Sequence, residues 1–131
     1  MVSIPSDLRY TKDHEWARRE DDGSVRVGVT EYAVAQLGDV TLVDLPKEGA
    51  DIGAHARFGD IESVKTVSEL FAPLAGKIVA VNAELEDRPE LVNEDPYGAG
   101  WMVVIAPSAA DDWDALLDAA GYEAHLAALE G

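Results

Sequence analysis

The first third of the chain alternates apolar and polar residues in the pattern of β-strands. Valines occupy every second position from 25 to 29, which is the period of a strand with one buried face. Residues 21–23, Asp-Asp-Gly, come just before this run and form a typical turn sequence. We therefore expect a hairpin that joins a strand from Glu15 to Arg19 with a strand from Ser24 to Val29.

A short helix and another strand are expected next. Thr30 belongs to the residue types that cap helix N-termini, and Gly38 suits the C-terminal end of a helix. The spacing between them predicts a helix from Glu31 to Leu37. The apolar run that follows predicts a strand from Val40 to Leu45.

Apolar and β-branched residues recur between Ala56 and Val81, after turn material from Lys47 to Gly53. Gly59, Pro73 and Gly76 interrupt them, which indicates several short strands joined by tight turns. The two glycines mark positions where the backbone turns sharply or approaches another segment closely.

The segment from Glu84 to Gly100 is irregular in pattern and rich in proline and glycine. It is expected to hold at most one helical turn, which would begin at Pro89. Trp101 to Ala106 is a nearly continuous apolar run and predicts a strand that is covered on both faces.

The C-terminal segment changes to a helical period. Ser108 and Asp111 resemble a capping box, and apolar residues from Trp113 to Ala120 follow helical spacing. Gly121 is expected to break this helix. A second short helix, from about Glu123 to Leu129, would then pack on the first.

These elements predict a mainly β fold, a flattened barrel or sandwich of two antiparallel sheets with a short internal helix and a C-terminal helical cap. The length of 131 residues suits one domain over positions 1–131. Positions 108–131 would form its C-terminal helical segment.

The charge of the chain narrows the choice of partners. Ten Lys and Arg against 26 Asp and Glu give a formal net charge of −16. This charge repels nucleic acid and anionic membrane surfaces and attracts proteins with basic docking surfaces. No apolar stretch approaches the ~20 residues that span a bilayer, and the N-terminus lacks signal-peptide features. A cytoplasmic protein is expected, or a mitochondrial matrix protein if the chain is a processed eukaryotic form.

The residue types needed for several kinds of site are missing or scattered. The absence of cysteine excludes structural disulfides, a thiolate zinc site and a catalytic thiol. His14, His55 and His125 show no metal-ligand spacing, so no metal site is expected. His14 is interpreted as a hydrogen-bonded turn residue.

The strongest candidate for chemistry is Lys65. Two strands rich in apolar and β-branched residues are expected to meet near it, which places its amine in solvent on a stiff support. A fixed base with a free tip suits both a modifying enzyme and a swinging prosthetic arm. Lys12, Lys47 and Lys77 lack this symmetric apolar framing. The alternative for a lysine at a strand turn is a solvated charge.

A family resemblance covers most of the chain up to about Pro107. Its centre is formed by Glu62, Ser63, Val64, Lys65 and Thr66. These five residues resemble the lipoylation motif of glycine cleavage H proteins. Other blocks resemble the family in the same order: residues 10–16, 27–33, 37–40, 45–46, 72–78, 81–82, 91–93, 95–98 and 100–102. Biotin carrier domains typically place Met on both sides of the modified lysine, and lipoyl domains of 2-oxoacid dehydrogenases usually place Asp before it. Val64 and Thr66 match neither class.

The resemblance implies a lipoyl/biotinyl-type fold and lipoic acid in amide linkage to Lys65, attached by a lipoate ligase or lipoyltransferase. The arm would take an aminomethyl group from pyridoxal-phosphate glycine decarboxylase to tetrahydrofolate-dependent aminomethyltransferase. FAD-dependent dihydrolipoyl dehydrogenase would reoxidise it. The chain itself would be a non-catalytic carrier of one-carbon metabolism. A monomer is expected, because an arm that visits several enzymes needs free access.

The resemblance also implies a surface cleft that shelters the loaded arm from water. Glu15 and Glu69 match acidic positions of that cleft, where a carboxylate would accept hydrogen bonds from the ammonium of the cargo. Many family members have a histidine before the Leu-Gly pair, whereas this chain has Gln36, which is polar but does not titrate. The alternative for Glu15 and Glu69 is two ordinary surface carboxylates.

Three other functions stay open at this point. An H-like protein that mainly relays lipoyl groups to other acceptors would need the same lysine. A hydrolase with paired carboxylates is a second alternative, although 26 acidic residues make some pair inevitable. An unmodified acidic interaction module is the third.

Overall fold

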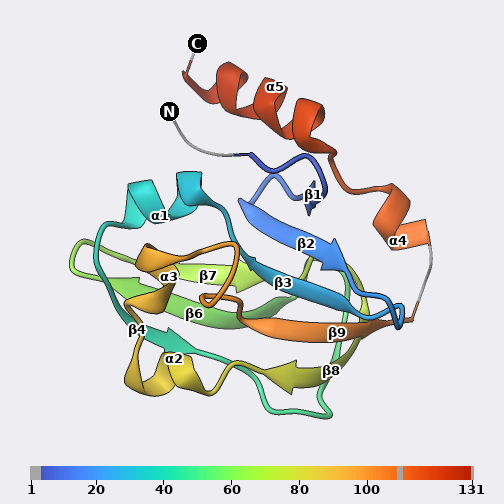
Figure 1. Ribbon diagram of the computed structural model, residues 1–131, viewed down its shortest axis with the longest axis horizontal. Coiled ribbons are helices and arrows are strands. Elements are labelled where there is room, and N and C mark those ends of the chain that lie inside the picture. Colours follow the sequence, from blue (N-terminus) through green and yellow to red (C-terminus); the bar gives the residue numbers. More distant parts are fainter. Residues whose placement is uncertain (1–3, 109–110, 131) are drawn as a thin grey trace.

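The computed structural model describes residues 4–108 and 111–130, and its strands form two antiparallel sheets (Figure 1). The larger sheet has the order β1-β2-β3-β9-β8-β5, with β1 Arg9–Tyr10, β2 Glu15–Arg19, β3 Val25–Val29, β9 Val103–Pro107, β8 Gly76–Val81 and β5 Asp51–Ile52. The smaller sheet has the order β4-β6-β7, with β4 Val40–Asp44, β6 Arg57–Ser63 and β7 Val67–Phe71. The helices are α1 Glu31–Leu37, α2 Glu84–Asp87, α3 Leu91–Glu94, α4 Asp111–Asp114 and α5 Ala119–Glu130.

The two sheets pack face to face as a sandwich, which confirms the predicted fold class. Their shared core contains Val27 and Ile78 from the larger sheet and Ile61 and Leu70 from the smaller one, each at most 2 % exposed. A second apolar cluster lies under α5 and includes Tyr10, Trp16 and Tyr122. Among the described residues, no helix is long and apolar enough to cross a membrane.

The predicted hairpin and helix in the first third are confirmed. Strand β2 has the expected bounds, and β3 begins one residue later than expected. Helix α1 spans Glu31–Leu37 as predicted, and the Thr30 hydroxyl accepts a hydrogen bond from the Ala33 N–H at 3.3 Å. Gly38 ends the helix at φ +77°, a backbone angle that glycine adopts without a Cβ clash.

The prediction for residues 84–100 was wrong, because this segment holds two short helices. Burial explains both of them: Leu85 of α2 is 1 % exposed, and Leu91 and Val92 of α3 are 6 % and 0 % exposed. Each helix is a single turn held by one or two apolar side chains in the core. Local sequence pattern does not reveal such turns, since their stability comes from tertiary packing.

The prediction for the C-terminal helices was also wrong. Gly121 lies inside α5, and the break falls at residues 115–118, where Leu117 exchanges two backbone hydrogen bonds with Tyr10. The Asp118 carboxylate accepts a hydrogen bond from the Gly121 N–H at 2.8 Å and so caps the new helix. Helix α5 packs on β1, where the Tyr122 ring stacks on the Tyr10 ring at 4.7 Å. The expected capping box depends on the Asp111 side chain, which lies outside the described part of the chain.

The last sheet strand and the close backbone approach at Gly59 and Gly76 are confirmed. The prediction that Gly59 interrupts the strands was wrong, because Gly59 lies inside β6. Strand β9 begins two residues later than predicted, and Val103, Val104 and Ile105 are all buried, so both of its faces are covered. A Cβ on Gly59 would lie 2.2 Å from the Asp44 carbonyl oxygen, and one on Gly76 would lie 2.1 Å from that of Ala106. Both glycines therefore allow a close approach of neighbouring strands.

We predict that Gly59→Ala lowers the free energy of unfolding by about 1 to 3 kcal/mol, because the added methyl group pushes β4 away from β6. Gly53→Ala is the matched control, since the nearest atom to its Cβ would be 4.0 Å away and its φ is not positive. Urea denaturation of both variants measures the difference. Equal stabilities for the two variants would contradict the close approach of β4 and β6.

Candidate functional site

Lys65 lies on the turn between β6 and β7, and Ser63 holds this turn in shape. The Ser63 hydroxyl accepts hydrogen bonds from the N–H groups of Lys65 and Thr66, each at 3.2 Å. The Ser63 N–H donates to the Thr66 carbonyl oxygen at 2.8 Å and closes the turn. The backbone that carries Lys65 is thus fixed by its own sequence neighbours.

The same turn is tied to the segment that follows α1. The Val64 N–H donates to the Asp39 carbonyl oxygen at 3.1 Å. Asn93 of α3 secures that segment from the other side, with its amide group donating to the Gly38 carbonyl at 2.7 Å and accepting from the Val40 N–H at 2.8 Å. The turn that carries Lys65 is therefore supported by two segments that are distant from it in sequence: residues 38–40 directly, and α3 through them.

The side chain of Lys65 is exposed, and its stem passes over Gly38. A Cβ on Gly38 would lie 3.4 Å from Lys65 Cε, so the glycine leaves room for the lysine stem. Every ion pair found among the described residues uses an arginine, and none involves the Lys65 ammonium. Lys65 thus has the fixed base and free tip that its sequence context predicts.

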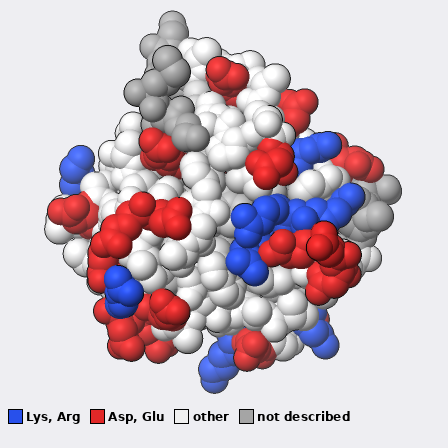
Figure 2. Space-filling model, in the orientation of Figure 1, with Lys and Arg blue, Asp and Glu red and all other residues white. Residues whose placement is uncertain are grey.

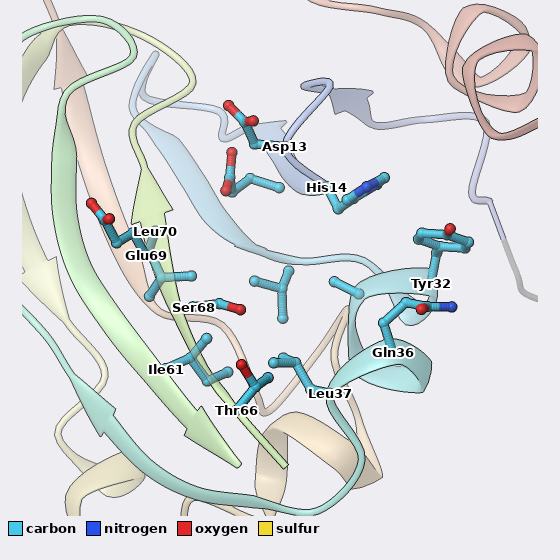
Figure 3. Close-up of a pocket in the computed structure, with 13 residues that line it drawn as sticks. Asp13, His14, Tyr32, Gln36, Leu37, Ile61, Thr66, Ser68, Glu69 and Leu70 are labelled. Carbon is cyan, nitrogen blue, oxygen red and sulfur yellow. The ribbon is translucent and has the colours of Figure 1, made fainter. Parts of the chain in front are cut away.

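A cleft of about 300 Å³ begins next to Lys65, at Thr66. Figure 3 shows Tyr32, Gln36 and Leu37 of α1 on one side of this cleft and Ile61, Thr66 and Ser68 on the other. His14 lies at its upper end in that view. The full lining is Asp13, His14, Glu15, Val29, Tyr32, Ala33, Gln36, Leu37, Ile61, Thr66, Ser68, Glu69 and Leu70.

Glu15 is the most unusual group in the cleft, because it is a carboxyl group that is only 2 % exposed. The Thr11 hydroxyl donates to one of its oxygens at 2.7 Å, and the Phe71 N–H donates to the other at 3.4 Å. Burial raises the pKa of Glu15 to about 8, the negative charge of Asp13 adds to the rise, and the two hydrogen bonds oppose it. The uncharged form is therefore favoured at neutral pH while the cleft contains no cation.

Glu69 and Gln36 border the same cleft, but in different ways. Gln36 is exposed on α1, one turn after Tyr32. The Glu69 carboxylate lies 3.8 Å from Arg57 and points away from the cavity in Figure 3. Strand alternation explains this orientation, since Ser68 pairs with buried Ile61 and so takes the inward position. Glu69 contributes to the rim of the cleft, and Ser68 is the polar side chain of β7 that faces it.

Sequence reasoning missed several residues of the cleft. His14 is a hydrogen-bonded turn residue, as interpreted, with φ +70° and its Nδ1 at 2.8 Å from the Tyr122 hydroxyl, but its ring also lines the cleft. No sequence motif or spacing marked Tyr32 or Ser68 as part of a cleft. The inward position of Ser68 follows from the β6–β7 register, which a single sequence does not reveal.

Acidic side chains are numerous on the surface of the protein. Figure 2 shows carboxylate side chains spread over the visible face, with a band of basic side chains to the right of its centre and a few others near the edge. Within the described ranges, no group of three or more His, Cys, Asp or Glu side chains is arranged to hold a metal ion. The excess of 26 Asp and Glu over ten Lys and Arg is thus visible as many exposed carboxylates on this face.

The fold is that of a lipoyl/biotinyl-type carrier domain. It is similar to the crystal structure of a glycine cleavage system H protein from Mycobacterium marinum, with a TM-score of 0.86 and 43% sequence identity over 95% of this chain and 99% of that one. The family model of the glycine cleavage H-protein matches residues 8–128. The chain belongs to the glycine cleavage H-protein family.

Relatives from other bacteria match at similar levels. The glycine cleavage system H protein of Anoxybacillus flavithermus is 54% identical over 122 residues, which cover 93% of this chain and 95% of the relative. That of Mycobacteroides abscessus is 52% identical over 126 residues, or 93% of this chain and 96% of the relative. The similarity thus extends beyond the motif around Lys65 to nearly the whole chain.

We predict that Glu15 makes the free energy of unfolding fall as pH rises. Between its pKa of about 4.3 in the unfolded chain and about 8 in the folded protein, the folded state keeps a proton that the unfolded state releases. Relative to Glu15→Gln, the wild type is expected to lose about 2 to 4 kcal/mol between about pH 5 and about pH 8. Urea denaturation at several pH values measures this loss.

Glu94→Gln is the control for this experiment, because Glu94 is an exposed residue of α3. Its pH profile should run parallel to that of the wild type. A parallel profile for Glu15→Gln as well would show that Glu15 ionises normally in the folded state.

Proposed function

We propose that this chain is the lipoyl carrier of a glycine cleavage system, with lipoic acid in amide linkage to Nζ of Lys65. One observation carries the proposal: in a member of this family, the lysine of the lipoylation motif is exposed on a rigid turn beside a cleft. Formation of an amide requires an accessible amine, and the Lys65 ammonium is in no ion pair among the described residues.

The residues around Lys65 fit a lipoyl arm. Val64 and Val67 flank it and are 68 % and 59 % exposed, so apolar surface lies beside the attachment point. Thr66, the next residue, already lines the cleft, and Leu37, Ile61 and Leu70 continue the lining with apolar side chains. An arm with an apolar stem and a reactive end would find apolar contacts along this path and polar groups near Glu15.

The lipoyl group supplies a disulfide that takes up the aminomethyl group and a dithiol that remains after its transfer. The proposed partners are glycine decarboxylase, aminomethyltransferase, dihydrolipoyl dehydrogenase and the lipoate ligase or lipoyltransferase that attaches the arm. The protein's own part is to hold and shelter the cargo. A cationic ammonium near Glu15 would lower the pKa of its carboxyl group, so the charged form would pair with the cargo in the water-poor cleft.

Several parts of this assignment stay predictions. They are the non-catalytic character of the chain, its monomeric state, its cytoplasmic location and its organisation as one domain over 1–131. The relay function is not favoured, because the matching relatives are named for glycine cleavage.

We predict that Lys65→Arg abolishes lipoylation without loss of stability, because a guanidinium on the same turn cannot form the amide. The measurement is intact mass and peptide mapping after expression with a lipoate ligase and lipoate. Lys77→Arg on β8 is the matched control, since Lys77 is also exposed. A single lipoyl group on the peptide that contains Glu62 to Glu69 is expected in the wild type and in Lys77→Arg. Lipoylation of the Lys65→Arg protein, or none of the wild type while a known H protein is modified, would contradict the proposal.

We also predict that docking to the partner enzymes weakens with salt, because the carrier has a formal net charge of −16. The apparent KM of each partner for the lipoylated protein should rise several-fold between ~0.05 M and ~0.5 M salt, where the Debye length shrinks to a few ångström. Each partner's activity on free lipoamide serves as the control. A KM that does not change with salt would count against electrostatic docking.

A further inference from the structure

Helix α5 contributes one buried hydroxyl group to the neighbourhood of the cleft. Tyr122 is fully buried, and its Oη lies 2.8 Å from His14 Nδ1 and 2.7 Å from Thr30 Oγ1. These two partners are 108 and 92 residues away in sequence. The C-terminal helix, which lies outside the sandwich in Figure 1, thus bonds directly to two residues beside the cleft.

His14 and Thr30, the two hydrogen-bond partners of Tyr122, are connected to different parts of the cleft. The His14 ring forms its upper end, next to Tyr32 at a ring distance of 4.7 Å. Thr30 caps α1 by accepting from the Ala33 N–H, and α1 supplies Tyr32, Gln36 and Leu37 to the lining. The Thr30 N–H also donates to the His14 carbonyl oxygen at 2.9 Å. The backbone hydrogen bond brings His14 and Thr30 together but does not fix the orientation of their side chains. The Tyr122 hydroxyl contacts both side chains and so fixes them relative to each other.

We propose that the Tyr122 hydroxyl is a positioning group of the arm cleft, which holds the His14 ring and the start of α1 at a fixed separation. The C-terminal helix is then part of the functional site, although none of its described side chains is among those that line the cleft. The proposal extends the proposed function, since it concerns the shelter of the cargo on the Lys65 arm.

The chemistry of the three groups explains why a hydroxyl is needed here. A tyrosine O–H donates one hydrogen bond and accepts another, so it can satisfy a histidine nitrogen and a threonine hydroxyl at the same time. The contacts that hold the His14 ring are the hydrogen bond with the Tyr122 hydroxyl and the packing against the Tyr32 ring. The His14 backbone has a positive φ of +70°, which surrounding contacts must also maintain. Phenylalanine at position 122 would preserve the stacking on Tyr10 and leave His14 Nδ1 and Thr30 Oγ1 without this shared partner.

The chain offers a matched control for this change. Tyr10 is as buried as Tyr122 and forms the other half of the stacked pair, but its hydroxyl donates to the Pro5 carbonyl oxygen at 2.5 Å. Tyr10→Phe and Tyr122→Phe therefore each remove one buried hydroxyl from the same aromatic pair. Only the second change removes a contact with residues of the cleft.

The first measurement is amide hydrogen exchange of the unmodified protein. We expect the Ala33 and Val34 amides, which bond to the side chain and carbonyl of Thr30, to exchange roughly tenfold faster in Tyr122→Phe, as loss of about one hydrogen bond implies. The β8–β9 amides serve as an internal reference for global stability. Tyr10→Phe should leave the α1 amides unchanged relative to this reference. Equal effects of the two variants on α1 would overturn the proposal.

The second measurement is the lifetime of the cargo on the isolated, loaded protein. Hydrolysis consumes one water, breaks the carbon–sulfur bond of the aminomethyl group and yields formaldehyde, ammonia and a free thiol. We expect formaldehyde release to be several-fold faster in Tyr122→Phe than in the wild type and Tyr10→Phe, because a loosened cleft admits water. Unchanged release in Tyr122→Phe, even with faster α1 exchange, would overturn the positioning role.

The two measurements separate the possible failures. A wild-type protein that cannot be lipoylated or loaded, under conditions that load a known H protein, contradicts the proposed function. The exchange experiment uses the unmodified chain and tests the Tyr122 contact by itself. Thr30→Ser keeps a hydroxyl group at position 30 and should retain slow exchange at Val34, whereas Thr30→Val should reproduce the effect of Tyr122→Phe.

Discussion

The site depends on the antiparallel pairing of β6 with both β7 and β4. Pairing with β7 places Lys65 on the turn between the two strands. Pairing with β4 brings the end of α1 to the same turn, because only Gly38 and Asp39 separate α1 from β4. The bond from Val64 to Asp39 and the passage of the Lys65 stem over Gly38 follow from this arrangement. The cleft between α1 and the hairpin arises from the same pairings.

The buried carboxyl group of Glu15, which lines this cleft, has a cost for stability. Burial disfavours the charged form of Glu15, and its hydrogen bonds from Thr11 and Phe71 only partly offset the lost hydration. A cation that enters the cleft would favour the charged form and so lower the pKa of this carboxyl group. In the proposed function, the ammonium of the cargo would be that cation and would pair with the charged Glu15 carboxylate.

The local sequence pattern was sufficient to predict an element wherever that element is stabilised by its own residues. The turn at 21–23, the Thr30 cap and the ending glycine of α1 act over a few residues, and these elements were predicted to within one residue. The helices at 84–87 and 91–94 were missed, because single turns of helix persist only through burial of Leu85, Leu91 and Val92. Gly121 was misread for a similar reason, since the pairing of Leu117 with Tyr10 decides where the helix breaks.

The sequence by itself determined the class of fold, the family, and the expectation that Lys65 lies exposed on a turn, because these depend on local chemistry and on motif order. Only the tertiary structure decided which side chains share the cleft. It turned Ser68 inward and Glu69 outward through strand register, buried Glu15 beneath the hairpin, and brought Tyr122 to His14 and Thr30. These contacts join residues far apart in the chain. Their geometry depends on packing between elements, which no local pattern encodes.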